Sequence, residues 1–164
     1  MNKEDYEILK KQLGREPEGA KEVLVRSKQG IPVVVRVSPI VNNRPFGSFY
    51  WLSCPDLKKQ IDHLEANGVI HKIQSEILDV DEEFYQKVKI DHENYIRDRL
   101  KYIKVDQLED QIPDNIWPSL KKRGVGGVQN FRSIRCLHMH YAQHLIYGNT
   151  IGKHLDENYN LIRS

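Results

Sequence analysis

The 164-residue chain has only two cysteines, Cys54 and Cys136, and no long apolar run. Two cysteines exclude a disulfide-rich scaffold and a zinc site built from four cysteine ligands. A helix that spans a bilayer needs about 20 consecutive apolar residues, which this sequence does not contain. A basic and then apolar leader of the secretory type is also missing. We therefore expect a cytoplasmic protein that does not insert into a membrane.

Acidic residues are missing from one quarter of the chain. Residues 115–155 contain six Lys or Arg and no Asp or Glu, although the formal net charge of the whole sequence is only +2. Four of the seven histidines also lie there, whereas residues 56–110 carry fourteen acidic residues. A basic, histidine-rich segment predicts a site for a small anion or a metal ion. The acidic stretch beside it argues against a nucleic acid as the partner.

The order of the expected elements predicts an α+β fold in one domain, 1–164. Residues 1–13 have the apolar spacing of a helix, and residues 20–55 contain the Val-rich and aromatic runs of strands. Residues 56–155 are expected to be mainly helical. A small antiparallel sheet from the N-terminal third should therefore pack against a C-terminal helical half.

Individual segments give more specific expectations. We expect a hairpin from residues 22–26 and 32–37, joined by a Ser-Lys-Gln-Gly turn, and a third strand at 48–53. The segment Val69 to Ile73 is expected to be a fourth strand. Residues 129–147 are expected to form the last major helix, closed near Gly148-Asn149.

The first chemical candidate is Cys54, which stands before Pro55 where an aromatic strand changes into a helix. Free N–H groups and the dipole at a helix start favour thiolate, so Cys54 is a candidate nucleophile or metal ligand. The alternative is a small buried residue with no chemical role.

The second candidate is a metal site in the sequence from Cys136 to His144. On a helix, Cys136, His140 and His144 share one stripe, and Cys54 would complete a zinc site with two sulfur and two nitrogen ligands. His138 points away from that stripe unless the helix begins only after Cys136. The alternatives are histidines at a helix surface and, less suited to a reducing compartment, a Cys54–Cys136 disulfide.

The third candidate is an anion site around a glycine-rich loop. Backbone N–H groups at Gly126 and Gly127 can converge on an anion, beside the basic Arg123. Arg132 and Arg135 are three residues apart and could form a fork for phosphate or carboxylate. The alternative is a solvated basic loop with ordinary turn glycines.

Several motifs together are similar to those of one bacterial family. They are Phe-Gly-Ser-Phe-Tyr-Trp-Leu-Ser-Cys-Pro (46–55), Leu-Glu-Ala-Asn-Gly (64–68), Gly126-Gly127, Arg-Cys-Leu-His (135–138) and the segment from Gly148 to Gly152. Over about residues 14–155 the chain resembles the domain of unknown function 501 family. The resemblance implies a small cytoplasmic protein with no assigned activity, in which Cys54, Cys136 and His138 are the signature polar residues. Genes of that family often lie near those for a septum-formation initiator and an exopolyphosphatase-type enzyme, so the resemblance also suggests phosphate or nucleotide chemistry.

These observations favour a small-anion or metal-binding domain whose site joins the Cys54-Pro55 turn to residues 126–144. The alternative is a hydrolase or phosphoryl-transfer enzyme, with His138 or His144 as general acid/base and Cys54 or Cys136 as the nucleophile. A further alternative is a protein-interaction module that uses the acidic helix expected at 81–103.

Overall fold

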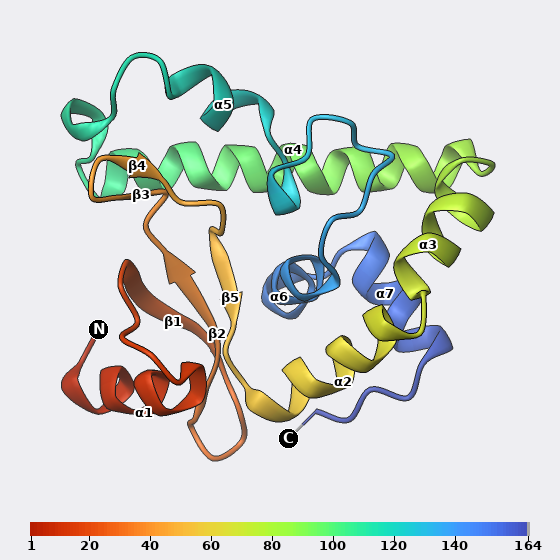
Figure 1. Ribbon diagram of the computed structural model, residues 1–164, viewed down its shortest axis with the longest axis horizontal. Coiled ribbons are helices and arrows are strands. Elements are labelled where there is room, and N and C mark those ends of the chain that lie inside the picture. Colours follow the sequence, from red (N-terminus) through yellow and green to blue (C-terminus); the bar gives the residue numbers. More distant parts are fainter. Residues whose placement is uncertain (164) are drawn as a thin grey trace.

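One helix precedes the strands and the other helices follow them in the computed structural model, which describes residues 1–163 (Figure 1). The strands are β1 (Ala20–Arg26), β2 (Pro32–Val37), β3 (Ile40–Val41), β4 (Arg44–Pro45) and β5 (Tyr50–Leu52). The helices are α1 (Lys3–Leu13), α2 (Pro55–Ala66), α3 (Val69–Ile73), α4 (Glu82–Val105), α5 (Trp117–Lys122), α6 (Leu137–Tyr147) and α7 (Thr150–Asn158). This arrangement confirms the expected α+β class.

The main sheet is antiparallel and has the strand order β1-β2-β5. Val35 is paired with Val23 of β1 on one side and with Trp51 of β5 on the other, so the expected hairpin and third strand are confirmed. All six residues of β2 are buried, because α1 packs against this strand and α6 packs against the sheet beside it. The short β3–β4 hairpin follows, and Asn42 and Asn43 make its turn with positive φ angles.

Helix α6 lies at the centre of the helical half, between β5 and α7 and below the long helix α4 (Figure 1). Its residues Leu137, Tyr141 and Ala142 are fully buried. Helix α4 is tied to the sheet by Tyr95, whose hydroxyl accepts a hydrogen bond from the backbone N–H of Phe49 at 3.0 Å. No helix within residues 1–163 combines the length and the apolar character that a membrane crossing requires.

The expectation of a fourth strand at residues 69–73 is wrong, since this segment is helix α3. Val69 and Ile73 are four residues apart and both buried, which is the spacing of one helix face. In a run of only five residues, β-branched composition does not distinguish a strand from a buried helical turn. A π-helical turn at Gln74–Leu78 then leads toward α4.

The last major helix is shorter than expected. Residues 129–136 form an irregular segment, and α6 begins only at Leu137. Side chains from distant elements bind the backbone N–H groups of this segment: Gln74 accepts a hydrogen bond from Ile134 N, and Glu65 accepts one from Leu137 N. A further helix, α7, follows Gly148 and is capped by Asn149, whose side chain accepts from Gly152 N at 2.7 Å.

Candidate metal and anion sites

Cys136 occupies the cap position of α6 in an extended conformation, with φ −152° and ψ 122°. Its own side chain does not cap the helix, and the carboxylate of Glu65 takes over that role. Oε2 of Glu65 accepts the hydrogen bond of Leu137 N at 3.0 Å. The end of α2 is therefore fixed against the start of α6, and the Cys136 thiol lies where the helix dipole favours negative charge.

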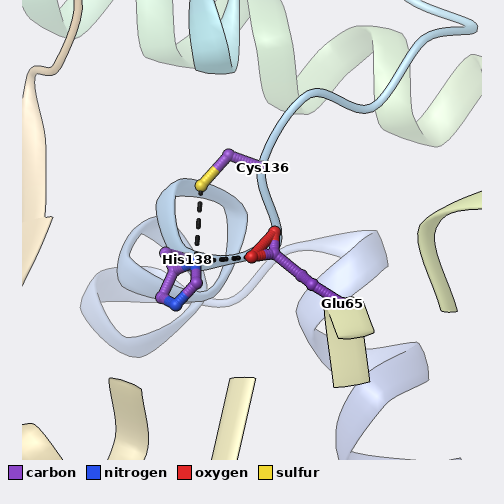
Figure 2. Close-up of side chains that lie close together, drawn as sticks. All are labelled: Glu65, Cys136 and His138. Atoms are coloured by element: carbon purple, nitrogen blue, oxygen red, sulfur yellow. Dashed lines mark hydrogen bonds and ion pairs between the residues drawn. The ribbon is translucent and has the colours of Figure 1, made fainter. Parts of the chain in front are cut away.

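The imidazole of His138 lies between this thiol and the carboxylate, as Figure 2 shows. Its Nδ1 is 3.5 Å from Cys136 Sγ and 3.0 Å from Glu65 Oε1. Its Nε2 is 2.8 Å from Oδ1 of Asp62, one turn earlier in α2. The imidazole of His138 thus lies beside the Cys136 thiol, because α6 begins after the cysteine.

Negative partners dominate the electrostatics of His138. Burial opposes protonation of the ring, but the Cys136 sulfur, Glu65 and Asp62 outweigh that effect and raise the pKa of His138 to about 9. The imidazole is therefore a cation at neutral pH in the metal-free protein. A group of anionic partners that stabilises one proton on this ring can also stabilise a metal cation in its place.

The sulfur of Cys136, a nitrogen of His138 and a carboxylate oxygen of Glu65 all lie within 4.8 Å of one another. With a Zn–S bond of about 2.3 Å and a Zn–N bond of about 2.0 Å, tetrahedral geometry requires sulfur and nitrogen to be about 3.5 Å apart. The observed separation of Sγ and Nδ1 is 3.5 Å. The separation of these two donor atoms is therefore the one that a tetrahedral zinc ion requires.

The other residues proposed for the metal site lie elsewhere. Cys54 is the cap residue of α2, and Glu65 is eleven residues further along the same helix, which corresponds to about 16 Å. His140 is buried and packs edge-on against His92 of α4, with ring centroids 5.3 Å apart. His144 pairs with Asp156, their Nε2 and Oδ2 atoms being 2.7 Å apart. The stripe expected from helical spacing does not come together.

Four of the five residues proposed for anion binding line one cavity of about 240 Å³. They are Arg123, Gly126, Gly127 and Arg135. The fifth, Arg132, is occupied elsewhere: its guanidinium bonds Glu82 and the carbonyl of Leu78, both at 2.7 Å, and covers the ring of Tyr85.

Sequence reasoning missed Asp62 and Glu65 around His138, and Arg99 at the cavity. It also missed His92, whose Nδ1 accepts a hydrogen bond from Val125 N in the glycine loop. Asp62 and Glu65 have the spacing of polar residues on an ordinary exposed face of a helix. His92 and Arg99 lie seven residues apart in α4, on the buried side that also carries Val88 and Tyr95. Their position in that apolar pattern could have identified them from the sequence, because a charged or titratable residue at a core position needs a partner.

The α+β fold, with a thiol, an imidazole and a carboxylate meeting at the start of a central helix, defines a small domain with a candidate metal site. The chain belongs to the family described as protein of unknown function (DUF501), whose family model matches residues 23–157. The match confirms the resemblance seen in the sequence motifs. No curated protein and no solved structure matches the chain.

Proposed function

We propose that this protein binds a transition-metal ion of the zinc class through Cys136, His138 and Glu65. The observation that carries the proposal is the convergence of their sulfur, nitrogen and oxygen atoms within 4.8 Å. Thiolate and imidazole favour Zn²⁺, whereas Mg²⁺ and Ca²⁺ take oxygen ligands.

The surroundings of the three ligands support this assignment. Zinc-bound histidines usually donate their second ring N–H to a carboxylate, which fixes the tautomer and the ring orientation. Asp62 provides such a partner, with Oδ1 2.8 Å from Nε2 of His138. Leu137 N similarly holds Oε2 of Glu65 and leaves Oε1 for the ion. Three protein ligands leave a fourth position for water or a small anion, as in catalytic zinc sites.

Metal analysis tests the proposal directly. Protein purified without a histidine tag is expected to retain about one zinc per chain, measured by inductively coupled plasma mass spectrometry. Cys136→Ser and His138→Ala are expected to lose most of it. Cys54→Ser is the matched control, because it replaces the other cysteine at the far end of α2. Equal metal loss in the two serine variants, or wild-type protein that binds no added zinc, contradicts the assignment.

A second candidate function is a thiol-dependent hydrolase with Cys136 as the nucleophile. One observation favours it: Nδ1 of His138 faces Cys136 while Nε2 faces Asp62, which is the order of a thiol–imidazole–carboxylate triad. His138, already protonated, would pair with the Cys136 thiolate; the thiolate would attack an acyl or phosphoryl centre, and the imidazolium would give its proton to the leaving group. Water would then release the product from Cys136.

Alkylation distinguishes the two candidates. Iodoacetamide is expected to modify Cys136 faster than Cys54, because Cys54 lies in the core and is only 9% exposed. If the site holds zinc, added zinc should protect Cys136. The hydrolase is favoured if Cys136 is alkylated rapidly, if added zinc does not slow the reaction, and if His138→Ala does slow it.

A further inference from the structure

A cavity of about 240 Å³ opens beside the segment that leads into α6, between α4, the end of α5 and the loop after β4. Three arginines from separate parts of the chain line it: Arg99 of α4, Arg123 after α5, and Arg135 just before Cys136. Ser119 also lines this cavity. No carboxylate from the described part of the chain lines this cavity.

Arg99 is a charged group held inside the protein without a counter-charge. It is 7% exposed, and its Nη2 donates to the carbonyls of Leu120 and Arg123. Its Nε is buried with no hydrogen-bond partner among residues 1–163. A guanidinium stays charged even when buried, and an unpaired buried charge is costly. The carbonyl bonds and the ring of Tyr95, whose centroid is 5.4 Å from Cζ, fix the side chain at the cavity but provide no counter-charge.

The arginines of the cavity differ from Arg36 and Arg132, which are paired with carboxylates. Arg36 is equally buried, but its guanidinium is paired with Glu22 at 2.8 Å and with Asp106 at 2.6 Å. Arg132 is paired with Glu82, although it stands only three residues before Arg135. By contrast, Arg99, Arg123 and Arg135 have no carboxylate partner within residues 1–163. Three arginines without a carboxylate partner are therefore grouped at one cavity.

The glycine loop brings this charge together. Gly126 has a φ angle of 75°, and a Cβ placed there would lie 3.1 Å from Cβ of Arg135. Glycine thus permits both the left-handed backbone and the close approach of the Arg135 segment. Arg123 Nη1 donates to the carbonyl of Gly127 at 2.9 Å, which ties the third arginine to the same loop.

We propose that this cavity binds a phosphoryl dianion, either inorganic phosphate or the phosphate end of a small monoester. Guanidinium groups match the oxygen geometry of phosphate, and several of them together neutralise two negative charges. A single carboxylate would supply only one charge against three arginines. The site shares no residue with the proposed metal ligands, so the inference does not depend on the proposed function.

Calorimetric titration of the full chain tests the inference. Inorganic phosphate and glycerol phosphate are titrated separately, at constant ionic strength set by chloride, into protein treated with EDTA. Saturable binding of either compound supports the site, and the comparison shows whether the free ion or the monoester is preferred. Treatment with EDTA removes metal-bound phosphate as an explanation.

Arg135→Gln is expected to weaken binding at least about tenfold, because it removes a charge-assisted hydrogen bond. Arg132→Gln is the matched control, with the same substitution three residues away at an arginine paired with Glu82, and it is expected to leave the affinity unchanged. Arg99→Lys should also weaken binding, since it keeps the charge but loses the planar fork. If that buried variant does not fold, Arg123→Gln replaces it. Absence of saturable binding to the folded wild type, or equal affinities of the Arg135 and Arg132 variants, overturns the inference.

Discussion

Acidic pH is expected to lower the stability of the folded protein through the buried imidazole of His92. The ring is fully buried in α4 and stacks on Phe131, with centroids 4.4 Å apart. Its Nδ1 accepts a hydrogen bond from the backbone N–H of Val125 at 3.0 Å. Because a protonated Nδ1 cannot accept, charging the ring both buries a cation and releases the glycine loop that lines the arginine cavity.

The magnitude follows from the pKa. Burial lowers the pKa of His92 from 6.5 to about 4. The unfolded chain therefore binds this proton first as the pH falls, and stability is lost between about pH 6.5 and pH 4. At about 1.4 kcal/mol per pKa unit, the full loss is about 3 kcal/mol, of which about 2 kcal/mol is reached by pH 5. Burial beside His92 also lowers the pKa of His140, which acts in the same direction.

Urea unfolding at pH 7 and pH 5 measures this effect when wild type is compared with His92→Asn. Asparagine keeps an acceptor close to the position of Nδ1 and does not titrate, so the wild type should lose about 2 kcal/mol more than the variant. The comparison cancels the other titrating groups, including His138, whose raised pKa favours the folded state at low pH. His63→Gln, on the exposed surface of α2, should retain the wild-type pH dependence. Equal pH dependence in wild type and His92→Asn would refute the reasoning.

Three further substitutions test other contacts. Gly124→Ala places a Cβ 2.3 Å from Nδ1 of His92 and should lower the free energy of unfolding in urea by about 2–3 kcal/mol. Gly47→Ala, with open space around its Cβ, should lower it far less. Similar losses of stability in the two variants would contradict the steric argument. Asp62→Asn should reduce zinc affinity about 10- to 100-fold in a chelator competition assay, because it weakens the bond that orients His138, and an unchanged affinity would remove Asp62 from the site. Asn149→Ala removes the cap of α7 and the bond to the His140 carbonyl, with an expected cost of about 1–3 kcal/mol; a wild-type melting temperature would show that the cap is dispensable.

Much of the fold could be predicted from the sequence because apolar spacing reports the face that each element buries. The Val-rich hairpin and the helix that begins at Pro55 were located in this way. The segment 69–73 was wrongly assigned to a strand, since five residues are too few to separate a strand period from a helix period. Helix α7 was missed because its cap, Asn149, was interpreted as the end of the preceding helix.

The site was only partly predictable, because its geometry depends on contacts between distant segments. Helical spacing favoured His140 as the partner of Cys136, whereas the family motif favoured His138. The choice is set by Glu65, which lies 72 residues before Leu137 and accepts its backbone hydrogen bond. No local pattern around residue 136 contains that information. The same holds for Arg99, which reaches the glycine loop from α4.

X-ray absorption spectroscopy of the zinc-loaded protein tests the central claim most directly, because it measures the ligands themselves. The proposed site predicts one sulfur at about 2.3 Å and nitrogen or oxygen neighbours at about 2.0 Å, with the sulfur contribution absent in Cys136→Ser and retained in Cys54→Ser. A spectrum without sulfur in the wild type, or one whose sulfur survives the Cys136 substitution, would contradict the assignment of Cys136, His138 and Glu65 as a metal site.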